Sequence, residues 1–92
     1  MPLKYNTFGN SVNIKGYTST AYIVPCDGYI NFATDSIAAS GFCQLTINGT
    51  LYARTFGNSN YGGFSAIFVK KGMTVLVGGN SLGLVEFYPL KQ

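Results

Sequence analysis

Turn-forming residues interrupt this chain about every ten residues, and this spacing limits the fold more than any other feature. Gly, Asn, Ser and Thr separate short apolar runs, and no stretch repeats with the period of an amphipathic helix. Such a pattern is typical of antiparallel sandwiches and barrels. We therefore expect an all-β protein, a small antiparallel β-sandwich or jelly roll of about eight short strands. The strands are expected at residues 12–16, 20–24, 29–34, 42–47, 50–56, 64–69, 73–77 and 83–88.

The stretch QLTINGTLYA at 44–53 predicts a hairpin with a two-residue turn. A type I′ turn needs positive φ at both central residues, and Asn-Gly is its preferred pair. Asn48-Gly49-Thr50 also matches the acceptor for an N-linked sugar. We favour the turn, because the chain begins without a signal peptide and every residue then finds a partner. The expected register pairs Ile47 with Thr50, Thr46 with Leu51, Leu45 with Tyr52, Gln44 with Ala53, Cys43 with Arg54 and Phe42 with Thr55.

Two further turns follow from residue types with restricted or permissive backbones. Pro25 presets φ near the value that opens a turn, and Gly28 follows where positive φ is expected. Lys70 and Lys71 precede Gly72 in a second break of this kind. The structural turn residues are therefore expected to be Pro25, Gly28, Asn48, Gly49 and Gly72.

Three of the expected strands, the two of the hairpin and strand 64–69, have apolar residues on both faces. In the hairpin, Phe42 and Leu51 lie on the face that points away from the core. Strand 64–69 has Ile67 and Val69 on one face and further apolar residues on the other. A strand with one face in water alternates apolar and polar residues, so a second surface must cover these positions. We expect self-association through Phe42, Leu51, Ile67 and Val69; the alternative is that some of them lie at the rim of the sandwich.

The residue types that most enzymes use are scarce. Charged residues make up 10% of the chain and hydrophobic residues 47%, which excludes a disordered protein. The chain has no histidine, the commonest general base and metal ligand, and its acids Asp27, Asp35 and Glu86 are far apart in sequence. No glycine-rich loop has the spacing that cradles a phosphate. We therefore expect no enzyme activity, no metal site and no cofactor.

The net charge of +3 does not indicate a nucleic-acid-binding protein, because only Lys70 and Lys71 are adjacent among the basic residues. Cys26 and Cys43 could form a disulfide, but a reducing cytosol favours two free thiols. The start of the chain has no apolar run that resembles a signal peptide or membrane anchor. We expect one domain, 1–92, without membrane insertion, in which 1–16 is either an N-terminal arm or an edge strand.

The loop GNSNYGG at 57–63 is the expected contact site for a partner. Asn58, Asn60 and Tyr61 combine amide groups with a ring that is rigid, apolar and polar at its tip. Together with Tyr17 they would suit a sugar ring or a partner protein. The alternative is a solvated loop that only joins two strands.

Several segments together resemble a known family. YIVPCDGYINF at 22–32, LTINGTLY at 45–52 and the segments VKKGMTVLV and VEFYPLK within 69–91 resemble the small jelly-roll heads of bacteriophage virion proteins. Those heads are similar in shape to tumour-necrosis-factor and C1q heads. The resemblance covers about residues 20 to 91, but each motif alone is mostly turn chemistry that other sandwiches share.

The resemblance implies a homotrimer that is made in the host cytoplasm and displayed on the virion, as a capsid decoration protein or a fibre tip. Its partners would be itself and other virion proteins. No binding site follows from the resemblance. Two alternatives remain: a host-receptor or glycan-binding module that uses the loop at 57–63, and an intracellular β-sandwich adaptor. The adaptor accounts for the composition but not for the order of the motifs.

Overall fold

The computed structural model describes residues 7–8, 10–35, 41–57 and 63–91. These residues form strands and no helix, which confirms the all-β prediction. The strands are β1 (Thr7–Phe8), β2 (Val12–Asn13), β3 (Tyr22–Ile23), β4 (Gly28–Ala33), β5 (Phe42–Ile47), β6 (Thr50–Phe56), β7 (Phe64–Val69), β8 (Thr74–Gly79) and β9 (Leu84–Lys91).

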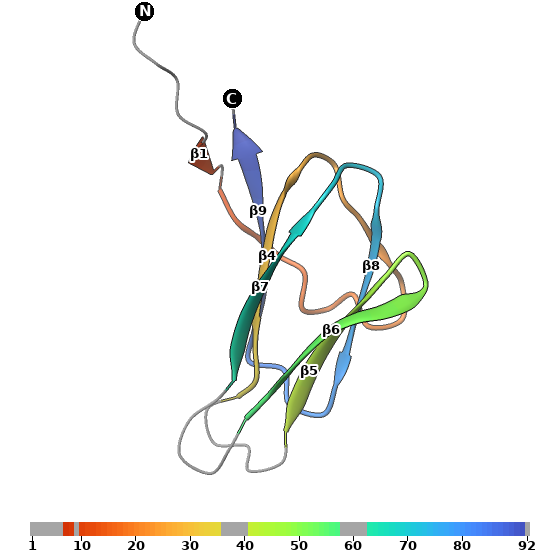
Figure 1. Ribbon diagram of the computed structural model, residues 1–92, viewed down its shortest axis with the longest axis vertical. Coiled ribbons are helices and arrows are strands. Elements are labelled where there is room, and N and C mark those ends of the chain that lie inside the picture. Colours follow the sequence, from red (N-terminus) through yellow and green to blue (C-terminus); the bar gives the residue numbers. More distant parts are fainter. Residues whose placement is uncertain (1–6, 9, 36–40, 58–62, 92) are drawn as a thin grey trace, which may run out of the picture.

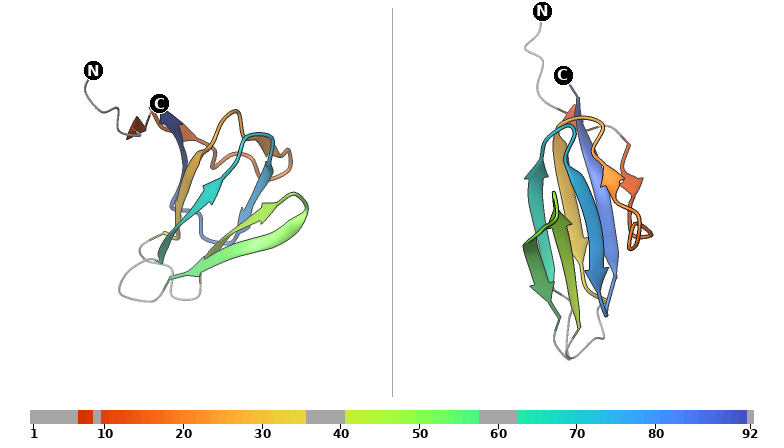
Figure 2. Two further views of the ribbon diagram at one scale, coloured as in Figure 1. Left: turned by 45° about the horizontal axis from the view of Figure 1, so that its top comes forward. Right: turned by 90° about the vertical axis from the view of Figure 1, so that its right-hand side faces the viewer.

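The strands form two antiparallel sheets that face each other (Figure 1, Figure 2). One sheet has the order β1-β9-β4-β7, with β2 also paired to β9, and the other has the order β3-β8-β5-β6. From β2 to β9 the chain changes sheet at every connection except the β5–β6 hairpin. This is the connectivity of a jelly roll, one of the two arrangements that the turn spacing predicted.

The core fills the space between the two sheets. Alternate residues of the long strands point inward, because side chains along a strand alternate between its faces. Phe32 and Phe87 are the largest of these side chains, and neither is accessible to solvent. Burial of each contributes about 2–3 kcal/mol to folding. The buried cluster consists of Ile14, Val24, Ile30, Phe32, Cys43, Leu45, Ile47, Val69, Val75, Val77, Val85 and Phe87.

Three predicted strands, 42–47, 50–56 and 64–69, have the observed bounds of β5, β6 and β7. The first two predicted strands are shorter, since β2 and β3 contain two residues each. β2 ends where the Asn13 side chain accepts the Lys15 N–H at 2.9 Å and bends the chain. β1, which was not predicted, pairs with β9, as does β2. Within 1–16, residues 7–8 and 12–13 therefore form short edge strands along β9.

The two-residue turn of the hairpin is confirmed, but most of the predicted register is wrong. Asn48 and Gly49 have φ values of 52° and 85°, as a type I′ turn requires. The pairs Ile47–Thr50 and Thr46–Leu51 also form as predicted. A bulge follows, in which Tyr52 is the extra residue of β6. The four remaining pairs are instead Leu45–Ala53, Gln44–Arg54, Cys43–Thr55 and Phe42–Phe56.

The bulge has a physical reason. Without it, Tyr52 and Arg54 would lie on the core face, opposite Leu45 and Cys43, both of which are fully buried. A buried guanidinium without an acidic partner would destabilise the fold strongly. The shift by one residue turns Arg54 outward and places smaller side chains on the inner face of β6.

Of the other predicted turn residues, Gly72 lies in a turn, as expected, whereas Gly28 lies in a strand. Gly72 has a φ of 91° and its N–H donates to the Val24 carbonyl at 2.8 Å. Pro25 lies in the connection between β3 and β4. Gly28 is the first residue of β4. It must be glycine for lack of space, because a Cβ there would overlap the carbonyl oxygen of Tyr88.

Candidate functional site

Both outer faces of the sandwich retain large apolar side chains that are accessible to solvent. Single exposed apolar residues are common on soluble proteins, whereas groups of neighbouring ones mark contact surfaces. Packing of the core does not account for these exposed side chains. The exposed large hydrophobic residues are Val12, Ile23, Tyr29, Leu51, Tyr52, Phe56, Phe64, Phe68 and Leu84.

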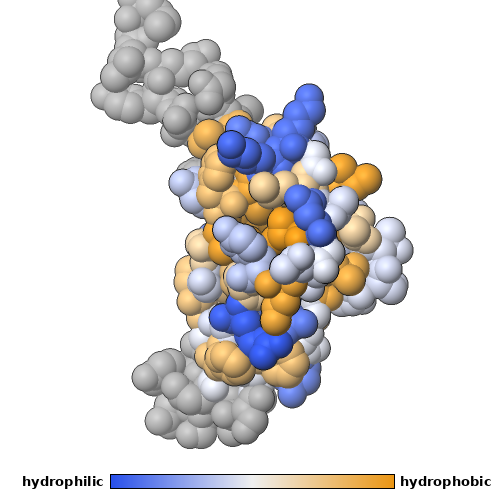
Figure 3. Space-filling view, turned by 45° about the vertical axis from the view of Figure 1, so that its right-hand side comes forward, coloured by the Kyte–Doolittle hydropathy of each residue, from blue (hydrophilic) through white to orange (hydrophobic). Residues whose placement is uncertain are grey.

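The first surface is the outer face of the β3-β8-β5-β6 sheet. Ile23, which is 66% exposed, and Leu51, which is 49% exposed, belong to its two edge strands, β3 and β6. Leu51 points outward because its partner Thr46 alternates with the buried Leu45. Figure 3 shows this side of the molecule, where hydrophobic and hydrophilic surfaces alternate. The face is therefore mixed rather than uniformly apolar.

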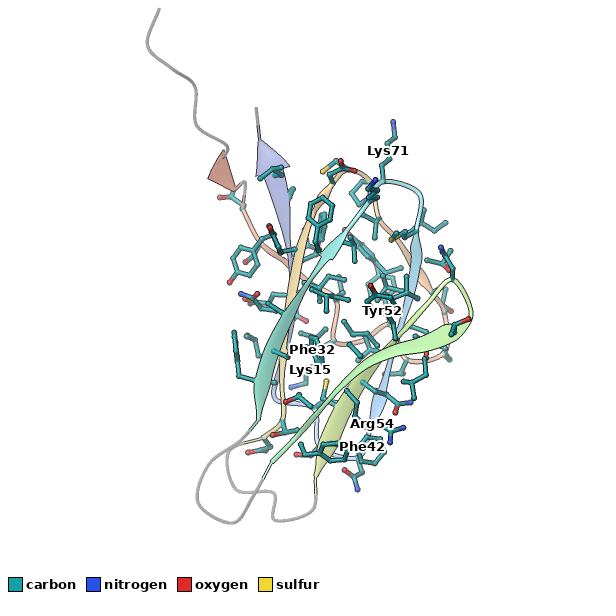
Figure 4. All side chains as sticks on the ribbon, viewed as in Figure 1. Lys15, Phe32, Phe42, Tyr52, Arg54 and Lys71 are labelled. Carbon is teal, nitrogen blue, oxygen red and sulfur yellow. The ribbon has the colours of Figure 1, made fainter. Side chains whose placement is uncertain are left out.

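The guanidinium of Arg54 lies over two aromatic rings on this face. Its guanidinium carbon lies 5.1 Å from the ring centroid of Phe42 and 5.9 Å from that of Phe56. The Nε–H of Arg54 donates to the side-chain oxygen of Gln44 at 2.9 Å. Figure 4 shows Arg54 and Phe42 together at one end of β5 and β6. The arrangement combines cation–π attraction with a fixed donor fork, which suits recognition of a carboxylate or a carbonyl.

The second surface is the outer face of the β9-β4-β7 sheet. Tyr88, Tyr29 and Phe68 lie in one row across these three strands. The rings of Tyr29 and Phe68 meet edge to face, with centroids 5.3 Å apart. The Tyr88 hydroxyl donates to a Glu86 carboxylate oxygen at 2.8 Å, and this bond raises the pKa of Tyr88. A row of aromatic side chains therefore crosses this face.

The four predicted interface residues divide between surface and core. Phe42 and Leu51 lie on an outer face, as expected. Val69 is only 1% exposed and belongs to the core, and Ile67 packs against that core. Val69 is therefore not accessible to a partner, and the prediction for β7 chose the wrong face. Phe64, Ala66 and Phe68 are the outward residues of this strand.

The predicted contact loop is placed only in part. Asn58, Asn60 and Tyr61 lie outside the described residues. Tyr17 packs against the core, with its ring edge to face on Tyr22 at a centroid distance of 5.1 Å. Burial, reinforced by the neighbouring Tyr17, raises the pKa of Tyr22. The Tyr17 ring therefore has a packing role in the sandwich.

Both cysteines are free thiols. Cys43 is buried in the core, and this burial raises the pKa of its thiol to about 11. Among the described residues, no three His, Cys, Asp or Glu side chains lie close enough to hold a metal ion. The same residues contain no helix that could span a membrane.

Comparison with known proteins found no match among protein-family models, curated proteins or solved structures.

Proposed function

We propose that this chain is a non-catalytic structural protein of a bacteriophage virion, a homotrimer displayed on the particle as capsid decoration or as a fibre tip. The observation that supports self-association is the pair of outer faces with exposed apolar residues, such as Leu51 on one sheet and Phe68 on the other. A domain of this size that functions alone would gain solubility from polar residues at these positions.

The segments that resemble virion heads supply the rest of the proposal. The turn after Pro25 leads into β4, the Asn48-Gly49 turn joins β5 to β6, and the Gly72 turn leads into β8. Their order along a jelly-roll chain supports the virion assignment and, with it, the threefold symmetry.

Native mass tests the assembly. For the wild type we expect three chains of 9.9 kDa each, about 30 kDa, or a multiple of three, by light scattering across a concentration series. Leu51→Glu places a charge on the outer face of β6 and should lower the mass to a single chain or a smaller assembly. Thr18→Glu, at an exposed loop position, is the matched control and should leave the mass unchanged. A monomeric wild type would contradict the proposal.

Binding assays then separate the two virion roles from receptor recognition. A decoration protein should bind bare capsids and raise their thermal stability, without affinity for host cells. A fibre tip should bind host cells, and Asn60→Ala with Tyr61→Ala should abolish that binding if the loop at 57–63 is the contact. Binding to neither capsids nor cells, by an assembled protein, would exclude the virion role.

A further inference from the structure

We propose that two copies of this protein pair through the free edge of β7, and that the sheet β1-β9-β4-β7 continues across a twofold axis at Ala66. This inference is independent of the proposed function, since an edge contact requires neither a trimer nor a virion. It rests on three features of β7: its unpaired backbone, its lack of protective residues and the self-complementary order of its side chains.

β7 is the last strand of its sheet, and within the described part of the chain it pairs only with β4. The end of β6 lies close to the start of β7, where Gly63 sits beside the carbonyl of Phe56. From there the two strands diverge (Figure 1, Figure 2). The remaining length of the β7 edge is therefore open to another strand.

The hydrogen bonds to β4 fix which backbone groups of β7 point to this open edge. The Thr34 N–H donates to the Gly63 carbonyl at 2.9 Å, directly before β7. In an antiparallel pair, residues alternate between those that bond to the neighbour and those that do not. The N–H and C=O groups of Phe64, Ala66 and Phe68 therefore point away from β4.

The other sheet edges carry features that discourage pairing, and β7 has none of them. β1, β2 and β3 contain two residues each, and β3 is followed closely by Pro25. β6 has both a bulge and Arg54. β7 has six residues, FSAIFV, with no charge, proline or glycine. A long, flat and uncharged edge strand is the type that pairs with another chain.

The order of the side chains matches a twofold axis at Ala66. In that register, Ala66 lies opposite Ala66 of the partner subunit, and Phe64 lies opposite Phe68 of the partner subunit. The backbone groups that face outward then form about six hydrogen bonds between the copies. A register shifted by two residues would instead place Lys70 opposite Phe64, with a lysine in the ladder.

The outer face of the sheet would also become continuous. Phe68 packs edge to face on Tyr29 within one copy, at 5.3 Å between centroids. On its other side it would meet Phe64 of the partner subunit. Phe64 and Phe68 are 63% and 42% exposed in a single chain, and pairing covers both. Cross-strand aromatic pairs of this kind add to the stability of a sheet. A second copy therefore satisfies both the backbone and the side chains of β7.

A cysteine at the axis gives a direct test. Directly opposed residues of a hydrogen-bonded pair have Cα atoms about 5.5 Å apart, within the range that a disulfide spans. In a Cys26→Ser background, Ala66→Cys should form a covalent dimer under mild oxidation. The control is Leu84→Cys, an exposed position on the same face, away from the edge. Ala66→Cys should give at least about ten times more dimer; equal yields would overturn the proposal.

Two further variants test the contact without a cross-link. Ala66→Pro removes an N–H that faces the open edge, so it blocks pairing but loses no bond to β4. Ala66→Lys keeps the backbone and places two ammonium groups opposite each other. Each should lower the native mass at least twofold, with the far-UV circular dichroism of the wild type. An unchanged mass in both folded variants, or a monomeric wild type, would overturn the proposal.

The same measurement distinguishes this inference from the proposed function. If the wild type contains six chains and Ala66→Pro leaves three, the trimer and the edge contact both hold. If it leaves one chain from a wild-type dimer, the edge contact holds and the trimer fails. If wild type and variant both contain three chains, the trimer holds and the edge contact is wrong.

Discussion

Variants of Asn48 would measure two contributions of the hairpin tip to stability: the turn itself and the hydrogen bond from its side chain to β8. The residue adopts a φ of 52°, which a side chain with a Cβ atom rarely does. Its backbone N–H donates to the Thr74 carbonyl at 2.9 Å, and its side-chain oxygen accepts the Thr74 N–H at 3.0 Å. Asn48 therefore both forms the turn and binds it to the first residue of β8.

The two contributions can be assigned to different variants. Asn48→Gly keeps the positive φ but loses the side-chain bond, at a cost of about 1 kcal/mol. Asn48→Ala loses the bond and also forces alanine into the left-handed region, for a total of about 2 kcal/mol. In a domain of this size, 1 kcal/mol lowers Tm by about 4–8 °C, so the two variants should differ by a similar amount. Asn48→Asp keeps the acceptor and tolerates the φ, and should remain close to the wild type.

Thermal unfolding followed by far-UV circular dichroism, at one pH and one protein concentration, would measure this series. Thr18→Ala, at an exposed loop position, is the control for substitutions that touch no turn. We expect the highest Tm for Asn48→Asp, a lower Tm for Asn48→Gly and the lowest Tm for Asn48→Ala. If Asn48→Ala unfolded at the same temperature as Asn48→Asp, the reasoning about the turn would be refuted. If Asn48→Gly were the least stable, the backbone contribution would be wrong.

Two other predictions concern close packing and burial. Gly28→Ala should lower the free energy of unfolding, measured in urea, by about 2–3 kcal/mol, because its Cβ would overlap the Tyr88 carbonyl and approach the Phe87 ring. The control is Gly16→Ala, whose Cβ meets no atom within 4 Å, and it should be nearly neutral. Stability should also fall between pH 9 and pH 11, because Cys43 keeps its proton in the folded state to about pH 11, whereas the unfolded thiol ionises near pH 9. Cys43 should contribute a fall in the unfolding free energy of about 1.4 kcal/mol per pH unit in this range. Cys43→Ala should remove this contribution when the unfolding free energy is measured in urea at each pH. The same pH dependence in the wild type and in Cys43→Ala would contradict the burial argument.

The sequence predicted the central strands well, because their limits depend on local chemistry. Asn48 and Gly49 end β5 and begin β6 through their own backbone preference. Gly72 does the same for the turn between β7 and β8. The short strand β1 and the role of Gly28 could not be predicted in this way. Both depend on β9, which is distant in sequence and supplies the pairing partner in one case and the steric limit in the other.

The inner face of β7 could not be chosen from the sequence. The alternation of side chains separates Ile67 and Val69 from Phe64 and Phe68, but both sets are apolar. Only the pairing with β4, in which Ile30 and Phe32 point into the core, selects Ile67 and Val69 as inward residues. β7 is apolar on both faces, as predicted, but Ile67 and Val69, which were expected on the outer face, are the residues that face the core.

The bulge in β6 helps to explain why copies of this protein should pair through β7 and not through β6. A strict two-residue hairpin would have placed Arg54 inside the sandwich and left the outer face of β6 without a charge. With the bulge, Arg54 lies over Phe42 and Phe56 at the edge of its sheet. A charge and an irregular backbone both oppose strand pairing at that edge. β7, the long edge strand of the other sheet, has neither, so pairing between copies should concentrate on β7.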